Sequence, residues 1–415
     1  MTEDHRTEAS CLLEQGAQYP TRIGLKPRSA GDPILAGLRR GGFSIYFGDA
    51  PFYHFDLDGR WQRAIIEDTH YLKGLDGAVH AIDRVREGAG LVLNRRRLGD
   101  ERTAGLDAIV RETILELLAN LERGDLIPLT PPAGRGSPLG TDRLRELLGQ
   151  IGAWDAPAWL AHRNRFASTY GPPSFLPPEG SGAVLIDASR HDDKDPESFE
   201  RHLRDVASLW GRRLFQAKTL YLGGPRFLKQ PRCVVDQCLT ATRRVFPVGP
   251  AVDDHSPCFH GIHAFLDDFA SPRPDQDSWR RYHELGLARV SLSVDSGAGA
   301  IRARHGKTWA DHDLVQAVAE LKRAGLGASV LLRVGAGGLE QADAHRRQTA
   351  AVLDSLALAR GDLVFLLDER ELGDPRDPIP DEAWLESRRL LKDALAPLKT
   401  RGVKVVAYTM DKQGS

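Results

Sequence analysis

Hydrophobic and polar positions follow a regular alternation over the second half of the chain. From residue 179 onward, short continuous apolar runs alternate with stretches whose apolar residues recur every three or four positions. The runs predict strands at Val184–Ile186, Thr219–Leu222, Gly261–Leu266, Arg289–Val294, Ala328–Val334, Leu363–Leu367 and Val403–Tyr408. The stretches between them predict helices over residues 197–215, 231–245, 275–286, 311–324, 341–359 and 381–399. Continuous apolar strands alternating with helices are typical of parallel strands buried on both faces. The expected class is therefore α/β, with a parallel TIM-type β/α barrel, partial or full, over residues 179–415.

A different pattern occupies the first part of the chain, where aromatic and β-branched runs are short and separated by turn sequences. The runs begin at Phe43, Phe52 and Trp61, and Gly48–Pro51 and Asp56–Gly59 lie between them. Apolar residues in Ala104–Leu121 recur at helical spacing and predict one amphipathic helix. Residues 36–126 are therefore expected to form a small α+β accessory domain, an antiparallel meander covered by a helix.

The segments beside this domain lack a clear period. Residues 1–35 combine glycine, proline and charge, which predicts a flexible lead-in. Residues 127–178 contain the proline- and glycine-rich runs Ile127–Pro138 and Gly171–Pro178 with a helical segment between them. They are expected to form a linker with a connecting helix.

Charge and hydropathy narrow the function classes. The chain has 56 Lys+Arg against 57 Asp+Glu and a formal net charge of -1, which argues against nucleic acid and anionic membranes as partners. No run of eighteen apolar residues occurs, and the N-terminus is polar rather than signal-like. These features predict a cytoplasmic protein. Four cysteines, Cys11, Cys233, Cys238 and Cys258, are too few and too scattered for a disulfide framework.

Several segments of the predicted barrel resemble a known family when taken in their order along the chain. They are Ser174–Pro178, Tyr221–Gly224, His260–Asp267, Leu285–Gly297, Leu321–Leu326 and Val334–Gly338. This order resembles the radical SAM enzymes, in particular the branch of oxygen-independent coproporphyrinogen oxidase-like and Elp3-like proteins. His345 and Thr349, after the fifth strand, also match that branch. The resemblance covers about residues 170–370 and implies a barrel that binds S-adenosylmethionine (SAM) at its strand ends.

One departure from the family pattern concerns the iron–sulfur cluster. In that family, a CxxxCxxC loop after the first strand holds a [4Fe-4S] cluster whose open iron binds SAM. The corresponding segment here, Asp187–Pro196, contains no cysteine. Cys233 and Cys238, on one predicted helix, point about 140° apart. Cys258 precedes the third strand, at the opposite end of the barrel. A degenerate iron–sulfur site without a [4Fe-4S] cluster is therefore expected.

The resemblance also implies a set of SAM contacts at strand ends. Gly223 and Gly224 match the turn that binds the methionine amino group, although Pro225 replaces an acidic residue there. Ser293, Asp295 and Ser296 match the segment near the ribose, and Arg333 and Gly335 fall at the fifth strand end. Ordinary strand-to-helix turns are the alternative interpretation of these residues.

Acidic and basic side chains also gather at the predicted strand ends. The acids and histidine are Asp187, His191, Asp192, Asp267, Asp268, Asp295, Asp368 and Glu369, and the arginines are Arg226, Arg302, Arg333 and Arg370. They could bind a divalent metal or form a network of ion pairs, and the absence of a metal-type spacing favours ion pairs. A second group before the third strand, Asp253, Asp254, His255, His260 and His263, is interpreted as a polar loop. No metal ligand and no catalytic residue is assigned.

Three functions follow from these patterns. The first is a radical SAM-derived protein that retains a SAM or nucleoside site without radical chemistry. The second is a non-catalytic scaffold, or pseudoenzyme, whose aromatic segments Tyr53–Asp56 and His70–Asp76 bind a protein partner. The third is an enzyme with a repurposed polar or metal site at the mouth of the barrel. The expected partner is thus a small molecule or another protein.

Overall fold

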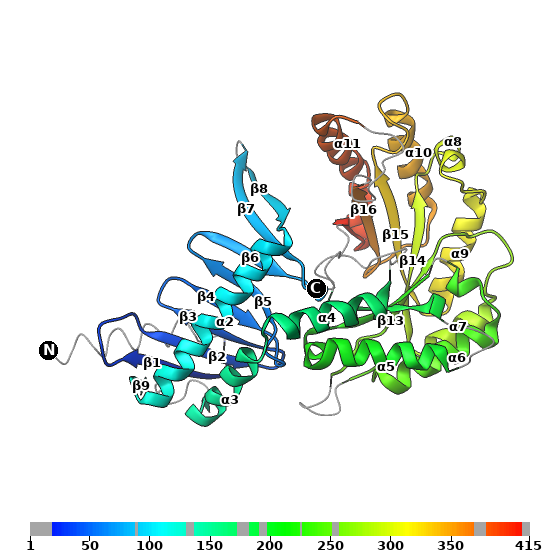
Figure 1. Cartoon of the computed structure of the whole chain (residues 1–415). Coiled ribbons are helices and arrows are strands. Elements are labelled where there is room, and N and C mark those ends of the chain that lie inside the picture. The colour runs from blue at the N-terminus through cyan, green and yellow to red at the C-terminus, as the bar shows by residue number, and fades with distance from the viewer. Residues whose placement is uncertain are drawn as a thin grey trace. The chain divides into compact units, whose positions relative to one another are not determined.

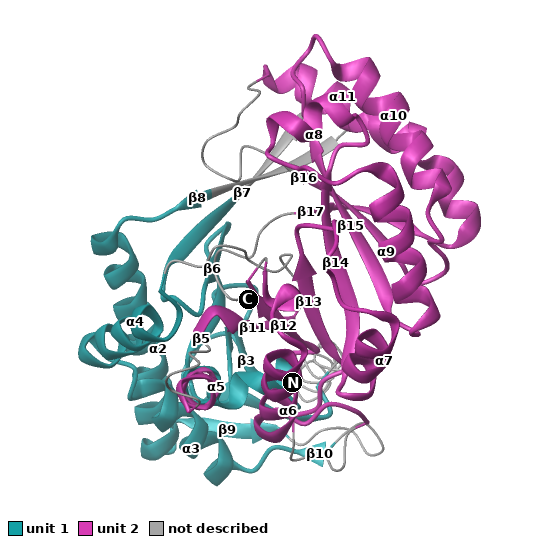
Figure 2. Ribbon diagram, turned by 90° about the vertical axis from the view of Figure 1, so that its right-hand side faces the viewer, with its two compact units in different colours: residues 1–171, 207–216, 414 teal, residues 172–206, 217–413, 415 magenta. Residues whose placement is uncertain are grey.

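The chain divides into two compact units in a computed structural model. The structure describes residues 19–87, 90–129, 137–171, 182–190, 197–224, 226–250, 257–368 and 379–408. Unit 1 contains residues 1–171 together with 207–216, and unit 2 contains residues 172–206 and 217–413 (Figure 2). The segment 207–216 therefore packs with unit 1, although the residues before and after it in the sequence belong to unit 2.

Unit 1 is built on one mostly antiparallel sheet. Among its described residues the strand order is β10-β1-β2-β3-β4-β5-β6-β7-β8, with β9 paired to β1 (Figure 1). The strands are β1 (Thr21–Pro27), β2 (Ile34–Arg39), β3 (Gly42–Phe47), β4 (Phe52–Phe55), β5 (Trp61–Ile66), β6 (Thr69–Lys73), β7 (Val79–Glu87), β8 (Gly90–Arg97), β9 (Leu126–Leu129) and β10 (Ser137–Pro138). The helices are α2 (Asp100–Arg123), α3 (Thr141–Gly152) and α4 (Ala156–Tyr170). The apolar stripe of α2 shares one core with Phe43, Ile45, Phe55 and Trp61 of the sheet, as the sequence pattern predicts.

Two segments beside the predicted accessory domain differ from expectation. The lead-in expected over residues 1–35 is too long, because β1 and the start of β2 lie within it. Gly24 and Gly37 interrupt the apolar pattern there, and the ring of Tyr19 covers Gly37 in place of a side chain. The expected linker over residues 127–178 is also wrong for its described part. It supplies β9, β10, α3 and α4, and the apolar side chains of both helices enter the core of unit 1.

Unit 2 contains the predicted alternation of strands and helices. Its described strands form a seven-stranded parallel sheet in sequence order: β11 (Ala183–Asp187), β12 (Thr219–Gly223), β13 (Ile262–Leu266), β14 (Leu287–Asp295), β15 (Gly327–Val334), β16 (Leu363–Asp368) and β17 (Lys404–Tyr408). Most helices lie between successive strands: α5 (Ser198–Trp210), α6 (Arg232–Val245), α7 (Gln276–Glu284), α8 (Gly299–Arg304), α9 (Asp311–Arg323), α10 (Ala342–Ser355) and α11 (Asp381–Ala394). β11 and β17 do not pair with each other among the described residues, so a closed barrel is not observed there and the sheet is open.

The strand order explains which face of this sheet is apolar. Right-handed crossovers between successive parallel strands place their helices on one face, and Figure 2 shows α7, α9 and α10 along that face. Leu222, Leu292 and Leu332, on successive layers of this side, are fully buried. The N-terminus of α7 is capped by Asp275, whose carboxylate accepts a hydrogen bond of 2.7 Å from Ser278 N. No helix among the described residues is long and apolar enough to cross a membrane.

Candidate functional site at the strand ends of unit 2

The face of the sheet that points away from the helices carries several polar side chains. Neighbouring strands bring Tyr221 opposite His263, and Ser291 opposite Ser329. The alternation Ser291-Leu-Ser-Val-Asp295 on β14 is visible in the sequence, and it signals a strand with one apolar and one polar face. Carboxyl ends of parallel strands are the usual position of ligand sites in α/β proteins.

Asp295 is the most constrained of the predicted site residues. It ends β14 with a φ of 62°, which is rare for a residue other than glycine, and a break in the strand register separates it from Ser293. Its side chain is nearly inaccessible, with a residue exposure of 2%. The Asp295 Oδ2 atom accepts no hydrogen bond from any residue that the structure describes.

Two cations and one hydroxyl surround this carboxylate. Arg333 Nε lies 3.1 Å from Asp295 Oδ1, and Lys307 Nζ lies 3.7 Å from Asp295 Oδ2. Ser293 Oγ donates a 3.3 Å hydrogen bond to Asp295 Oδ1. Burial by itself would raise the pKa of Asp295, but Arg333 and Lys307 outweigh it and hold the pKa below its ordinary value. Asp295 is therefore an ionised acceptor at neutral pH.

Lys307 links the strand ends of β13 and β14. Its ammonium group contacts the carboxylate of Asp267 and lies 3.1 Å from Ser293 Oγ. Sequence reasoning missed this residue, because it lies in the loop after α8 and has no motif around it. The described acids of the expected set form ion pairs: Asp267 and Asp295 pair with Lys307, Asp268 pairs with Lys229, and Asp187 pairs with Arg190. Arg302, from the same set, pairs with Asp311, which was not among the expected acids.

Ser296 has a different environment from Asp295. Ser296 Oγ lies 2.8 Å from His345 Nδ1 and accepts a 3.0 Å hydrogen bond from Ala298 N. One turn further along α10, Thr349 Oγ1 accepts a 2.8 Å hydrogen bond from Gly297 N. Burial lowers the pKa of His345 to about 4, so its imidazole is neutral at pH 7. These contacts fasten α10 to the end of β14.

The predicted glycines fall at two separate places. Gly224 follows β12 with a φ of 115°, and the nearest atom to an added Cβ would be 3.8 Å away, so the positive φ rather than a lack of space favours glycine there. Gly335 follows β15 with a φ of 82°, but an added Cβ there would lie 2.8 Å from Ile379 Cδ1. Gly335 therefore accommodates close packing. The structure brings Ser293, Asp295 and Arg333 together, and places Gly223 and Gly224 on the far side of β13.

The described residues hold no group of three or more His, Cys, Asp or Glu side chains arranged to bind a metal ion. His263 faces Tyr221, and burial together with Arg289 lowers its pKa to about 3. Several predicted positions lie outside the described residues: Pro225, His191, Asp192, Asp253, Asp254, His255, Glu369, Arg370 and the side chain of Asp368.

The described residues directly after β11, 188–190, offer no thiol to an iron–sulfur cluster. This strand end offers the Asp187 carboxylate, which accepts hydrogen bonds from Ser189 N and Ser189 Oγ at 3.0 and 2.6 Å. These oxygen groups are not the thiolates that a cluster requires. Cys233 is exposed and Cys238 is buried on the same helix, α6, so their thiols do not converge. Burial raises the pKa of Cys238 to about 12, which keeps it protonated.

Comparisons with known proteins show distant likenesses. No protein-family model matches the sequence, and no curated protein matches it. Elp3 from the archaeon Methanocaldococcus infernus is 14% identical with a TM-score of 0.35, over 56% of this chain and 60% of that one. Coproporphyrinogen III oxidase from Escherichia coli, a radical SAM enzyme, is 13% identical with a TM-score of 0.38, over 57% and 56%. Streptococcus suis SuiB, solved with SAM bound, is 10% identical with a TM-score of 0.34, over 84% and 72%. Likenesses of this size assign no function.

Proposed function

We propose that unit 2 binds SAM or a related nucleoside at the carboxyl ends of β12 to β15, without an iron–sulfur cluster and without radical chemistry. The observation that carries this proposal is the strained backbone and the buried carboxylate of Asp295. A non-glycine residue at positive φ costs of the order of 1 kcal/mol or more, and such strain is concentrated at functional sites. The same residue buries a carboxylate oxygen that has no hydrogen bond from the described chain.

The chemistry of Asp295 favours a ligand that donates hydrogen bonds. An ionised carboxylate is an acceptor only, and leaving one buried oxygen without a donor costs free energy. Vicinal hydroxyls of a ribose would donate to Asp295, with Ser293 as a further partner. Arg333 and Lys307 keep the carboxylate ionised, so that it retains its full strength as an acceptor.

The separation between Asp295 and Gly224 favours an elongated ligand with a different polar group at each end. One strand, β13, lies between β12 and β14, so the two positions are about 10 Å apart across the sheet. An amino acid joined to a nucleoside has a length of that order. The turn at Gly224, which is half-buried and whose φ is positive, suits the amino-acid end, as the family resemblance implies.

Cysteine chemistry supports the absence of a cluster. The sequence has no cysteine between Cys11 and Cys233, and the side chains after β11 are oxygen and nitrogen groups. We expect protein purified anaerobically, and then treated with iron and sulfide, to retain neither in stoichiometric amount. A radical SAM enzyme reconstituted in parallel serves as the positive control. Stoichiometric iron and acid-labile sulfide in this chain would overturn this part of the proposal.

Calorimetric titration tests the ligand site itself. Adenosine and SAM should both bind, and Asp295→Asn should weaken both by about tenfold or more, because a hydrogen bond to a charged group contributes about 1.5–3 kcal/mol. Asp393→Asn is the matched control, since it removes an exposed, ion-paired aspartate at the carboxyl end of α11. Its affinities should equal those of the parent protein.

A second variant separates the two ends of the ligand. Gly224→Ala strains a backbone with a φ of 115° where the amino-acid end would bind, so it should weaken SAM and leave adenosine unchanged. Unchanged adenosine binding then also shows that the fold is intact. Two results would contradict the proposal: no heat and no thermal stabilisation with millimolar SAM or adenosine, or equal binding by Asp295→Asn.

A further inference from the structure

Unit 1 contains a polar pocket of its own on the face of the sheet opposite to α2. The pocket has a volume of about 360 Å³, which is within the range of small-molecule sites. Its lining comes from β2 to β5 and from the end of the segment 207–216. The lining residues on which the argument rests are Arg39, Ser44, His54, Gln62, Arg63 and Gln216.

The sheet register places three of these side chains in one row. Ser44 on β3 is opposite His54 on β4, and His54 is opposite Arg63 on β5. Cross-strand neighbours point to the same face, so the hydroxyl, the imidazole and the guanidinium line one wall. Ser44 Oγ is hydrogen-bonded to His54 Nδ1. Arg39, at the end of β2, pairs with Gly42 and lies diagonally next to this row.

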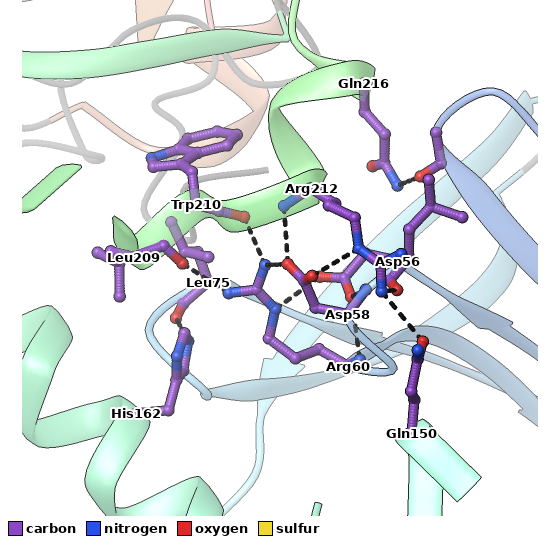
Figure 3. Close-up of polar contacts among 12 residues, drawn as sticks. Asp56, Asp58, Arg60, Leu75, Gln150, His162, Leu209, Trp210, Arg212 and Gln216 are labelled. Atoms are coloured by element: carbon purple, nitrogen blue, oxygen red, sulfur yellow. Dashed lines mark hydrogen bonds and ion pairs between the residues drawn. The ribbon is translucent and has the colours of Figure 1, made fainter. Parts of the chain in front are cut away.

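The second wall is held rigidly by the segment 207–216. Figure 3 shows Arg60 and Asp58 fastening this segment: Arg60 donates to Leu209 O at 2.6 Å and to Trp210 O at 2.5 Å, and Arg212 N donates to Asp58 Oδ2 at 2.7 Å. At its end, Gln216 Nε2 donates to Gly41 O at 2.5 Å and to Gln62 Oε1 at 3.1 Å. The pocket is therefore preformed, which lowers the entropic cost of binding.

The charge of the pocket is positive and locally uncompensated. Within the described part of the chain, neither Arg39 nor Arg63 forms an ion pair with a carboxylate; Arg39 lies over the ring of Tyr19, 5.2 Å from its centroid. Burial first, and then the charges of Arg39 and Arg63, lower the pKa of His54 to about 4. The imidazole is consequently neutral at pH 7, and both guanidinium groups act on the same small volume.

We propose that this pocket binds a small molecule through a phosphate or carboxylate group placed between Arg39 and Arg63. Guanidinium groups match the geometry of both oxyanions and bind them through paired hydrogen bonds. The amide of Gln62 and the Ser44–His54 pair offer further polar partners on the walls. Phe215, which is half-buried, also lines the pocket and provides a surface for the apolar part of the ligand.

The test follows the ring signals of His54 by NMR. These signals are assigned by their absence from the spectrum of a His54→Ala variant. Phenyl phosphate and benzoate are titrated at constant ionic strength, because they share a ring and differ in their oxyanion. At least one of them should shift the His54 signals saturably and raise the pKa of His54 above about 4, since an anion near Arg39 and Arg63 favours the imidazolium. The tighter of the two identifies the headgroup.

Charge variants make the test specific. Arg39→Gln and Arg63→Gln should each weaken binding by about tenfold or more. Arg102→Gln is the matched control, because it removes the same charge from the exposed side of α2, on the other face of the sheet. It should bind like the parent. Non-saturating shifts with both ligands, or equal affinity in all three variants, would overturn the proposal. Thermal unfolding of each variant verifies that unit 1 remains folded.

Discussion

Arg60 joins two parts of unit 1 that are about 150 residues apart in the chain. Its guanidinium is nearly inaccessible, donates to Asp56 Oδ2 at 2.6 Å, and also reaches Leu209 O and Trp210 O (Figure 3). Asp56 is buried as well, so the ion pair is hidden from water on both sides. Such a pair contributes little compared with apolar residues, but removing one partner leaves a buried charge uncompensated.

The residue-scale prediction concerns this ion pair. Arg60→Ala should lower the free energy of unfolding by about 3–5 kcal/mol, because Asp56 and two backbone carbonyls lose their donor. Arg212→Ala is the control in the same cluster. Arg212 is half-exposed and pairs with Asp58 at 2.9 Å, so its loss should be smaller. Urea denaturation measures both, and equal losses would contradict the interpretation.

The close contact between the end of β14 and helix α10 in unit 2 requires a glycine, Gly297. At Gly297 an added Cβ would lie 2.4 Å from Thr349 Cα and 2.5 Å from Gln348 O. Both are backbone atoms of a helix, so they cannot move independently. The close approach allows Gly297 N to reach Thr349 Oγ1 and Ser296 Oγ to reach His345 Nδ1. Ser296, which makes one of these contacts, directly follows Asp295 in the chain, so we expect a shift of α10 to displace the strand end.

The element-scale prediction uses two neighbouring glycines. Gly297→Ala should push α10 away from β14, lower the free energy of unfolding by about 1–3 kcal/mol, and weaken adenosine binding. Gly299→Ala, in the first turn of α8, should be neutral or slightly stabilising, because the nearest atom to its added Cβ is 3.7 Å away. Thermal unfolding compares the two. A neutral Gly297→Ala variant would show that this contact does not position the strand end.

At the scale of the whole molecule, buried histidines in both units make the free energy of unfolding depend on pH in the same direction. Burial is the first cause in each case, and it lowers the pKa of His54, His162, His202 and His345 to about 4 and that of His263 to about 3. Below the ordinary value of 6.5, these histidines take up protons in the unfolded chain but stay neutral in the folded one. The unfolded state is then favoured as pH falls.

The whole-molecule prediction is a loss of stability between pH 6.5 and about 4. Each histidine that takes up one proton on unfolding contributes a slope of about 1.4 kcal/mol per pH unit. Below that range Asp295 adds a loss in the same direction, since its pKa is lowered in the folded state. Urea midpoints measured across this range test the sign. Constant or rising stability on acidification would show that the histidines are not held neutral by burial.

The periodicity of the sequence predicted the strands and most helices of unit 2, but it missed the short helix α8 and several elements of unit 1. β15 was predicted at Ala328–Val334 and is observed at Gly327–Val334, because a buried parallel strand is continuously apolar. β1 was missed because Gly24 and charged residues break its apolar pattern. Its central residues are nevertheless buried, because neighbouring strands pair with it. Lys307 was missed for a similar reason, since its partners Asp267 and Asp295 are set by packing.

The sequence by itself determined the order of strands and helices, the absence of cysteines from the first strand end, and the acidic and glycine residues at the strand ends. Those properties depend on local period and composition. Only the tertiary structure decided that Asp295 is buried beside Arg333 and Lys307, that Gly335 is covered by Ile379, and that Arg39 and Arg63 share a pocket. The free energy of a charge depends on its burial and on partners far away in the chain. The pattern along the sequence contains neither.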